Sequence, residues 1–101
     1  HDHVDVAISL QNIGSVLVLQ GRLDEALAKH RESMEIKLKV LGHNHAVVSL
    51  GRCHLAFVME KKGDVQAAKQ EAREALEVYR RVLGDSHPET KYADSMVKRL
   101  G

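Results

Sequence analysis

The sequence predicts an all-α fold, a right-handed α-α superhelix made of two helical hairpins and a C-terminal capping helix. Two observations carry this prediction. Similar segments return every 42 residues, at His3, His45 and His87. Within each segment, apolar residues recur at the three- and four-residue spacing of a buried helix face. No segment alternates like a β-strand, and Pro88 is the only proline.

The period defines the units of the chain. Residues 3–42 align with residues 45–84 without a gap, and identical residues recur, among them Gly21 and Gly63. A third copy begins at Ser86 and stops halfway. We therefore expect one domain over residues 1–101, with repeat 1 near 3–42, repeat 2 near 45–84 and a half repeat or capping helix near 86–101.

Local residues predict where each helix begins and ends. Gly21 and Gly63 should end the first helix of each repeat, because glycine adopts the left-handed conformation found there. The residues before the three periodic histidines are Asp2, Asn44 and Ser86, all favourable N-caps. Ser86 to Glu89 also reads as a capping box with proline in the first turn. The expected helices cover residues 3–20, 23–41, 45–62, 65–83 and 87–100.

Composition narrows the class of protein. A content of 44% hydrophobic and 29% charged residues fits one small soluble domain. No apolar run approaches the roughly 20 residues that span a bilayer. The single Cys53 suits a reducing compartment, so we expect a cytoplasmic protein. With 15 Lys and Arg against 14 Asp and Glu, we expect neither nucleic acid nor membrane as a partner.

Candidate chemical sites are weak in this sequence. His1 with His3, and His43 with His45, read H-x-H, but the histidines are strung along the chain rather than gathered at metal-ligand spacing. No Ser/His/Asp grouping, glycine-rich phosphate loop or pair of carboxylates stands out. We therefore expect a protein that is not an enzyme and that holds no metal and no cofactor.

Several residues carry a family resemblance. The 42-residue period and the segment Lys39 to His45, which recurs at 81–87, resemble the repeats of kinesin light chains. Arg52 departs from the pattern, which has a large apolar residue there. His30 and Ala72 depart as well, because they replace the usual aromatic residue. The run that resembles a tetratricopeptide repeat is Leu10, Asn12, Ile13, Gly14, Leu17, Gln20, Gly21, Asp24, Glu25 and Ala26.

The resemblance implies a binding surface. In such repeats the first helices line a concave groove in which a partner lies as an extended peptide or a helix. Kinesin-light-chain-like repeats often carry asparagines where Gln11 and Asn12 stand, and only Asn12 keeps one. Cys53 and Phe57 also have a purely structural interpretation, as core residues. Carried over by position, the partner-binding residues are Gln11, Asn12, Ser15, Leu19, Cys53, His54, Phe57, Lys61, Ser95 and Arg99, within a wider lining that includes Ile8, Val18, Leu50, Glu60 and Tyr92.

Two functions remain open at this point. The first is a non-catalytic protein–protein interaction module or scaffold that binds a peptide or partner helix in the groove. The second is a structural spacer or self-assembling segment of a longer repeat array, which associates through open end-faces. For the second function, we expect the flank made by Val4, Ile8, Leu27 and Met34 to be open, and the last helix to act as a polar cap.

Overall fold

The computed structural model describes residues 3–101. Within this range the chain forms helices and no strands. Each predicted boundary agrees with the structure to within one residue. The helices are α1 (His3–Leu19), α2 (Leu23–Leu41), α3 (Ala46–Lys61), α4 (Val65–Leu83) and α5 (Pro88–Leu100).

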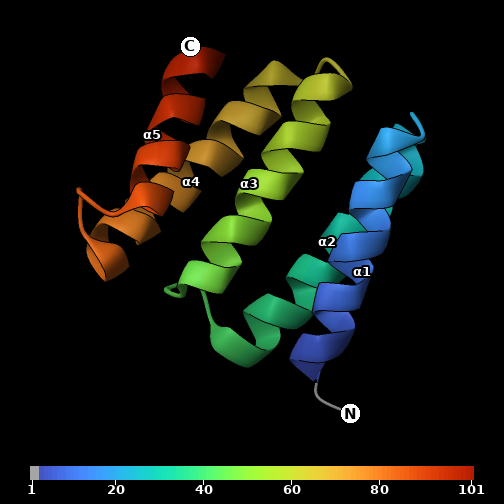
Figure 1. Ribbon diagram of the computed structural model, residues 1–101, viewed down its shortest axis with the longest axis horizontal. Coiled ribbons are helices and arrows are strands. Elements are labelled where there is room, and N and C mark those ends of the chain that lie inside the picture. The colour runs from blue at the N-terminus through green and yellow to red at the C-terminus, as the bar shows by residue number, and fades with distance from the viewer. Residues whose placement is uncertain (1–2) are drawn as a thin grey trace.

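The helices form two antiparallel hairpins and a final single helix (Figure 1). Helix α1 packs on α2, α3 packs on α4, and the two hairpins meet through α2 and α3, while α5 covers α4. Helices α1, α3 and α5 lie toward the viewer in Figure 1, with α2 and α4 behind them. The described residues measure 34 × 32 × 18 Å. Because one helix is about 10 Å thick, the shortest dimension corresponds to two layers of helices.

The turn inside each hairpin has the same geometry. Gly21 and Gly63 have φ values of 76° and 90°, in the left-handed region that glycine adopts without steric cost. The next residue closes the turn in both cases. The Arg22 N–H donates to the Leu17 carbonyl at 2.9 Å, as the Asp64 N–H does to the Met59 carbonyl. These are Schellman-type helix ends, as the sequence predicted.

Two of the three periodic histidines, His45 and His87, cap helices themselves. The His45 Nδ1 accepts a hydrogen bond from the backbone N–H of Val47 at 3.1 Å. The His87 Nδ1 accepts one from Glu89 with the same length. An imidazole nitrogen thus satisfies one of the unpaired amides of the first turn, as the oxygen of serine or aspartate usually does. This role explains why a histidine returns at each of these starts.

The predicted caps were therefore wrong by one position. Asn44 and Ser86 precede the cap residues, because α3 begins at Ala46 and α5 begins at Pro88. The capping box expected between Ser86 and Glu89 is not the observed cap. Pro88 does occupy the first turn, where its missing N–H costs nothing. Asp2 lies outside the described residues.

Small residues set the distance between helices. A Cβ atom on Gly14 of α1 would lie 2.8 Å from the ring of His30 on α2. A Cβ atom on Gly51 of α3 would lie 2.8 Å from the terminal methyl of Met34. Contacts this short do not occur between real side chains, so alanine at position 14 would clash with the His30 ring. The terminal methyl of Met34 is the end of a flexible side chain, so alanine at position 51 requires only that this methyl shift.

Arg52 replaces an apolar residue without leaving a buried charge unpaired. Its guanidinium forms ion pairs with Glu71 at 3.0 Å and Glu74 at 2.8 Å, both on α4. The Arg52 side chain is only 12% exposed. Repeat 2 therefore joins its two helices partly through charge, at a position where repeat 1 has Leu10.

The open flank lies elsewhere than the sequence suggested. Leu27 and Met34 were expected on it, but both belong to the hydrophobic core, with exposures of 9% and 6%. Ile8 is exposed as expected, at 44%. Leu27 and Met34 are buried because α2 packs on both α1 and α3.

Candidate functional site

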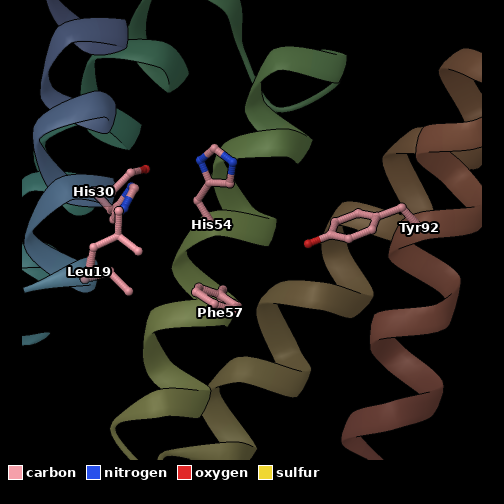
Figure 2. Close-up of a pocket in the computed structure, with 7 residues that line it drawn as sticks. Leu19, His30, His54, Phe57 and Tyr92 are labelled. Atoms are coloured by element: carbon pink, nitrogen blue, oxygen red, sulfur yellow. The ribbon is translucent and has the colours of Figure 1, made fainter. Parts of the chain in front are cut away.

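A pocket of about 340 Å³ lies among α1, α3 and α5. Figure 2 shows Leu19 and His30 on one side, Tyr92 reaching from α5 on the other, and His54 and Phe57 on α3 between them. Three of the four contributing helices are the first helices of their repeats. The residues that line the pocket are Ser15, Val18 and Leu19 from α1, His30 from α2, His54 and Phe57 from α3, and Tyr92 from α5.

The pocket walls are apolar side chains that remain exposed. Leu19 is 88% exposed, Tyr92 51% and Phe57 40%. Exposed large apolar residues are ordinary when scattered, but a concave group of them is typical of a ligand or partner site. A partner that covered these three side chains would gain the hydrophobic free energy that folding leaves unused.

Two histidines form the polar part of the lining. The rings of His30 and His54 meet edge to face, with centroids 5.6 Å apart and an interplanar angle of 69°. Burial, with contributions from His54 and Lys37, lowers the pKa of His30 to about 4. Burial and Lys37 also lower the pKa of His54. Both imidazoles are therefore neutral at neutral pH, and each offers one nitrogen donor and one acceptor.

One polar atom of this pair has no partner. The Nδ1 of His54 is buried and makes no hydrogen bond within the described residues. Buried nitrogen atoms are nearly always hydrogen-bonded in folded proteins, and an unpaired one carries a desolvation cost. The His54 ring thus has hydrogen-bonding capacity that the described chain does not use.

A buried lysine lies next to the histidine pair. Lys37 of α2 is 1% exposed, and its ammonium donates a hydrogen bond to the Oε1 of Gln11 on α1. Burial lowers the pKa of Lys37, since a charged group loses its hydration inside the protein. Gln11, predicted to contact a partner, is therefore engaged with the protein's own buried cation.

The cations at the pocket's edge also have internal contacts. The Lys61 ammonium lies over the Phe57 ring, 4.9 Å from its centroid, which is a cation–π distance. Arg99 of α5 forms an ion pair with Glu60 of α3. Glu60 neutralises the charge of Arg99, whereas the contact between Lys61 and Phe57 involves no carboxylate.

The structure brings some of the predicted residues together and separates others. Ser15, Leu19, His54 and Phe57 all line the pocket, as do Val18 and Tyr92 from the wider predicted lining. Asn12 and Ser95 are exposed but do not line it.

Cys53 does not lie on this surface. It is 0% exposed and belongs to the hydrophobic core. Burial, with a contribution from Glu89, raises the pKa of its thiol to about 12. The thiol therefore stays protonated and unreactive in the folded protein.

Sequence reasoning missed the position of His30 in this pocket. In the sequence His30 stands out as the replacement of the usual aromatic residue, and in the structure it is 4% exposed. Its ring nevertheless reaches the pocket, because Gly14 on the facing helix has no side chain to block it. A histidine opposite a glycine is the signal that could have indicated this.

Two further features bear on the chemistry of the molecule. Within residues 3–101, no three His, Cys, Asp or Glu side chains gather as metal ligands would. In the same range, no helix combines the length and apolarity needed to cross a membrane.

The fold and the groove together define a class, the α-solenoids built from repeated helical hairpins. Residues 5–79 match the tetratricopeptide repeat family, and the chain belongs to that family. The sequence resemblance is thereby confirmed. Tetratricopeptide repeats generally mediate protein–protein interactions and are typically non-catalytic scaffolds.

A solved structure has the same fold. The crystal structure of BtubC (BKLC) from P. vanneervenii matches with a TM-score of 0.90 over 99% of this chain, at 17% sequence identity. The chain spans 39% of the length of that protein. No curated protein matches the sequence. At this identity the likeness concerns the fold alone.

Proposed function

We propose that the chain is a non-catalytic binding module whose groove between α1, α3 and α5 takes a segment of a partner protein. The observation that carries the proposal is the pocket of about 340 Å³, which groups the exposed side chains of Leu19, Phe57 and Tyr92. These residues come from three different helices of the stack. A partner segment lying across them would contact both repeats and the final helix at once.

The residues that line the pocket indicate which kind of partner segment would fit it. Its walls favour an apolar or aromatic side chain as the anchor, because central apolar anchors supply most of the energy in small interfaces. Its lining residues include no carboxylate, so nothing in the pocket wall would pair with a cationic anchor. The hydroxyl of Tyr92, whose side chain lines the pocket and is half exposed, is available to a polar group beside the anchor, such as a backbone amide of the partner.

The asparagine-based mode of recognition is not part of this proposal. Asn12 is exposed outside the pocket, and Gln11 bonds to Lys37. Contacts made by apolar side chains therefore replace the amide contacts that the kinesin-light-chain resemblance implied.

The proposal can be tested with selected peptides. Peptides from a random 12-residue display library would be selected on the purified chain, and the affinity of the strongest would be measured by fluorescence anisotropy. Leu19→Glu and Phe57→Glu should each weaken binding by roughly tenfold or more, because truncating or charging a central anchor costs more than about 1 kcal/mol. The helical circular dichroism signal should be unchanged, since both side chains are exposed.

A matched control distinguishes binding in the groove from non-specific binding to exposed apolar residues. Val82 on α4 is 47% exposed and does not line the pocket, so Val82→Glu should leave the affinity unchanged. If selected peptides bind the Leu19→Glu and Phe57→Glu proteins as tightly as the parent, or if Val82→Glu weakens them equally, the groove is not the binding site.

A further inference from the structure

Helix α1 presents a second apolar surface that faces away from its partner α2. Val6 is 46% exposed, Ile13 47% and Val16 52%. Their spacing of seven and three residues places them along one face of the helix. None of the three lines the pocket described above. We call this the Val6–Ile13–Val16 face.

The equivalent residues of α3 are buried. One period later, Val48, Leu55 and Val58 are 0%, 5% and 0% exposed. These residues belong to the helix that docks the second hairpin on α2. The same three positions are therefore covered in repeat 2, which packs on the hairpin that precedes it in the sequence.

The equivalent residues of α5 are also covered, although their side chains differ. Thr90 and Leu100 are 2% and 9% exposed, and Val97 packs against the core where α5 docks on α4. Thr90 has the same shape as the valine at position 6. Two of the three copies of this face therefore lie against the second helix of a preceding hairpin, and the α1 copy does not.

We propose that the Val6–Ile13–Val16 face is a docking surface for the second helix of a further tetratricopeptide hairpin of the same 42-residue kind. The argument is continuity with an interface that the molecule already forms twice. Gly51 of α3 lies against Met34 of α2, and at the equivalent position α5 has the small residue Ala93 and α1 has the small residue Ser9. The face thus keeps both the apolar residues and the small residue of the two formed interfaces.

A second copy of this chain is the weaker occupant. Docking of this kind needs an uncovered second-helix face, and within residues 3–101 both second helices are covered. Met34 of α2 and Leu76 of α4 are each 6% exposed, because α3 and α5 lie on them. Two copies would therefore have to pair their α1 faces with each other, which is not the geometry seen inside the molecule.

The test lengthens the chain by one hairpin. Residues 45–86 are repeated directly before His3, which keeps the 42-residue spacing and supplies a second helix like α4. That helix is the appropriate one, because α4 already accepts a side chain, Ala93, at the position equivalent to Ser9. The probe is the rate of maleimide labelling at Val16→Cys, followed at that site by mass spectrometry, in the original and the lengthened chain.

Docking should slow this labelling by roughly tenfold or more in the lengthened chain, because a covered thiol reacts only when the structure opens. Val40→Cys is the matched control, since Val40 is 48% exposed on α2, outside this face, and its rate should not change. Ile13→Glu should lower the melting temperature of the lengthened chain while leaving the original chain unaffected.

Three results would overturn the proposal. The first is equal labelling of Val16→Cys in both chains. The second is a lengthened chain that shows no gain in helical signal, because docking should fold the added hairpin. The third is protection of Val16→Cys in the original chain that disappears on dilution, since this would make a second copy the occupant.

Discussion

At the scale of single residues, one buried hydroxyl lacks a partner. Ser49 is 0% exposed, and its Oγ makes no hydrogen bond within the described residues. The equivalent residue of repeat 1 is Ala7, also fully buried. We predict that Ser49→Ala raises the free energy of unfolding by about 1 kcal/mol, because a buried unpaired polar group costs about that much. Urea unfolding followed by circular dichroism measures the change.

Ser33 provides the control for this prediction. It is equally buried, but its Oγ donates to the Ala7 carbonyl at 2.6 Å. Ser33→Ala should therefore lower the free energy of unfolding, by about 1 kcal/mol. Equal losses in the two variants would mean that the Ser49 hydroxyl contributes to stability after all.

Arg52 allows a second residue-scale prediction. The Arg52 side chain, which forms ion pairs with Glu71 and Glu74, is largely shielded from solvent. Arg52→Ala should therefore lower the free energy of unfolding by about 2 kcal/mol, because it leaves Glu71, 18% exposed, without its cation. Combining Arg52→Leu with Glu71→Gln should recover most of the loss, because repeat 1 already uses Leu10 at that place. Thermal and urea unfolding of the parent and of these two variants measure this.

The exposed pair of Arg81 and Glu77 serves as the reference. Both side chains are more than half exposed, and exposed pairs contribute at most about 1 kcal/mol. Glu77→Gln should therefore have little effect. If Arg52→Ala were as mild, the pairing across α3 and α4 would be no stronger than a surface contact.

At the scale of helices, the histidine caps fix where α3 and α5 begin. We predict that His45→Ala lowers the free energy of unfolding by about 1 kcal/mol, the usual cost of losing an N-cap, because the Val47 amide loses its acceptor. His45→Asp should retain most of the stability, since a carboxylate oxygen accepts the same bond. Chemical denaturation ranks the three proteins, and equal stability of the alanine and aspartate variants would rule out a capping role.

Helix extents were predictable because their determinants are local. The left-handed glycines at 21 and 63 and the apolar period mark each helix without knowledge of its neighbours. The cap residues were not predicted correctly, because Asn44 and Ser86 are better caps on average than histidine. Only the observed backbone shows that the helix starts one residue later and that the imidazole nitrogen takes the bond.

The pocket was predictable only in part. Leu19 and Phe57 follow from position in the repeat, because the groove side of a first helix can be assigned from the resemblance to known repeats. The same reasoning wrongly placed Cys53 in the groove, because its side chain lies in the core. His30 required knowledge of two helices at once, namely that Gly14 leaves space for its ring. The sequence therefore does not indicate which side chains reach past a neighbouring helix into the pocket.

At the scale of the whole molecule, three basic side chains are buried near the junction of the two repeats. His30 and Lys37 come from α2 and His54 from α3, and each has its pKa lowered by burial. The groups that face them are Gln11 and the two rings themselves. Within residues 3–101 none of these three groups forms an ion pair with a carboxylate, so added positive charge here would oppose folding.

This arrangement predicts how stability depends on pH. The pKa of His30 is about 4 in the folded chain, against 6.5 for an unperturbed histidine. Between these values the unfolded chain binds a proton at His30 that the folded chain does not, so the free energy of unfolding falls as the pH falls. The stabilisation is complete above pH 6.5 and is lost progressively toward pH 4. The loss should amount to at most about 3 kcal/mol, since one pKa unit corresponds to about 1.4 kcal/mol.

Urea unfolding between pH 7.5 and pH 4 in the parent and in His30→Gln separates this effect from the protonation of carboxylates, which both proteins share. The parent should lose more stability than His30→Gln over this range, and the difference should develop below pH 6.5. His3→Gln is the control, because His3 is exposed at the start of α1, and it should follow the parent. Parallel pH profiles for the parent and His30→Gln would show that the ring beneath Gly14 takes up its proton as freely in the folded chain as in the unfolded one.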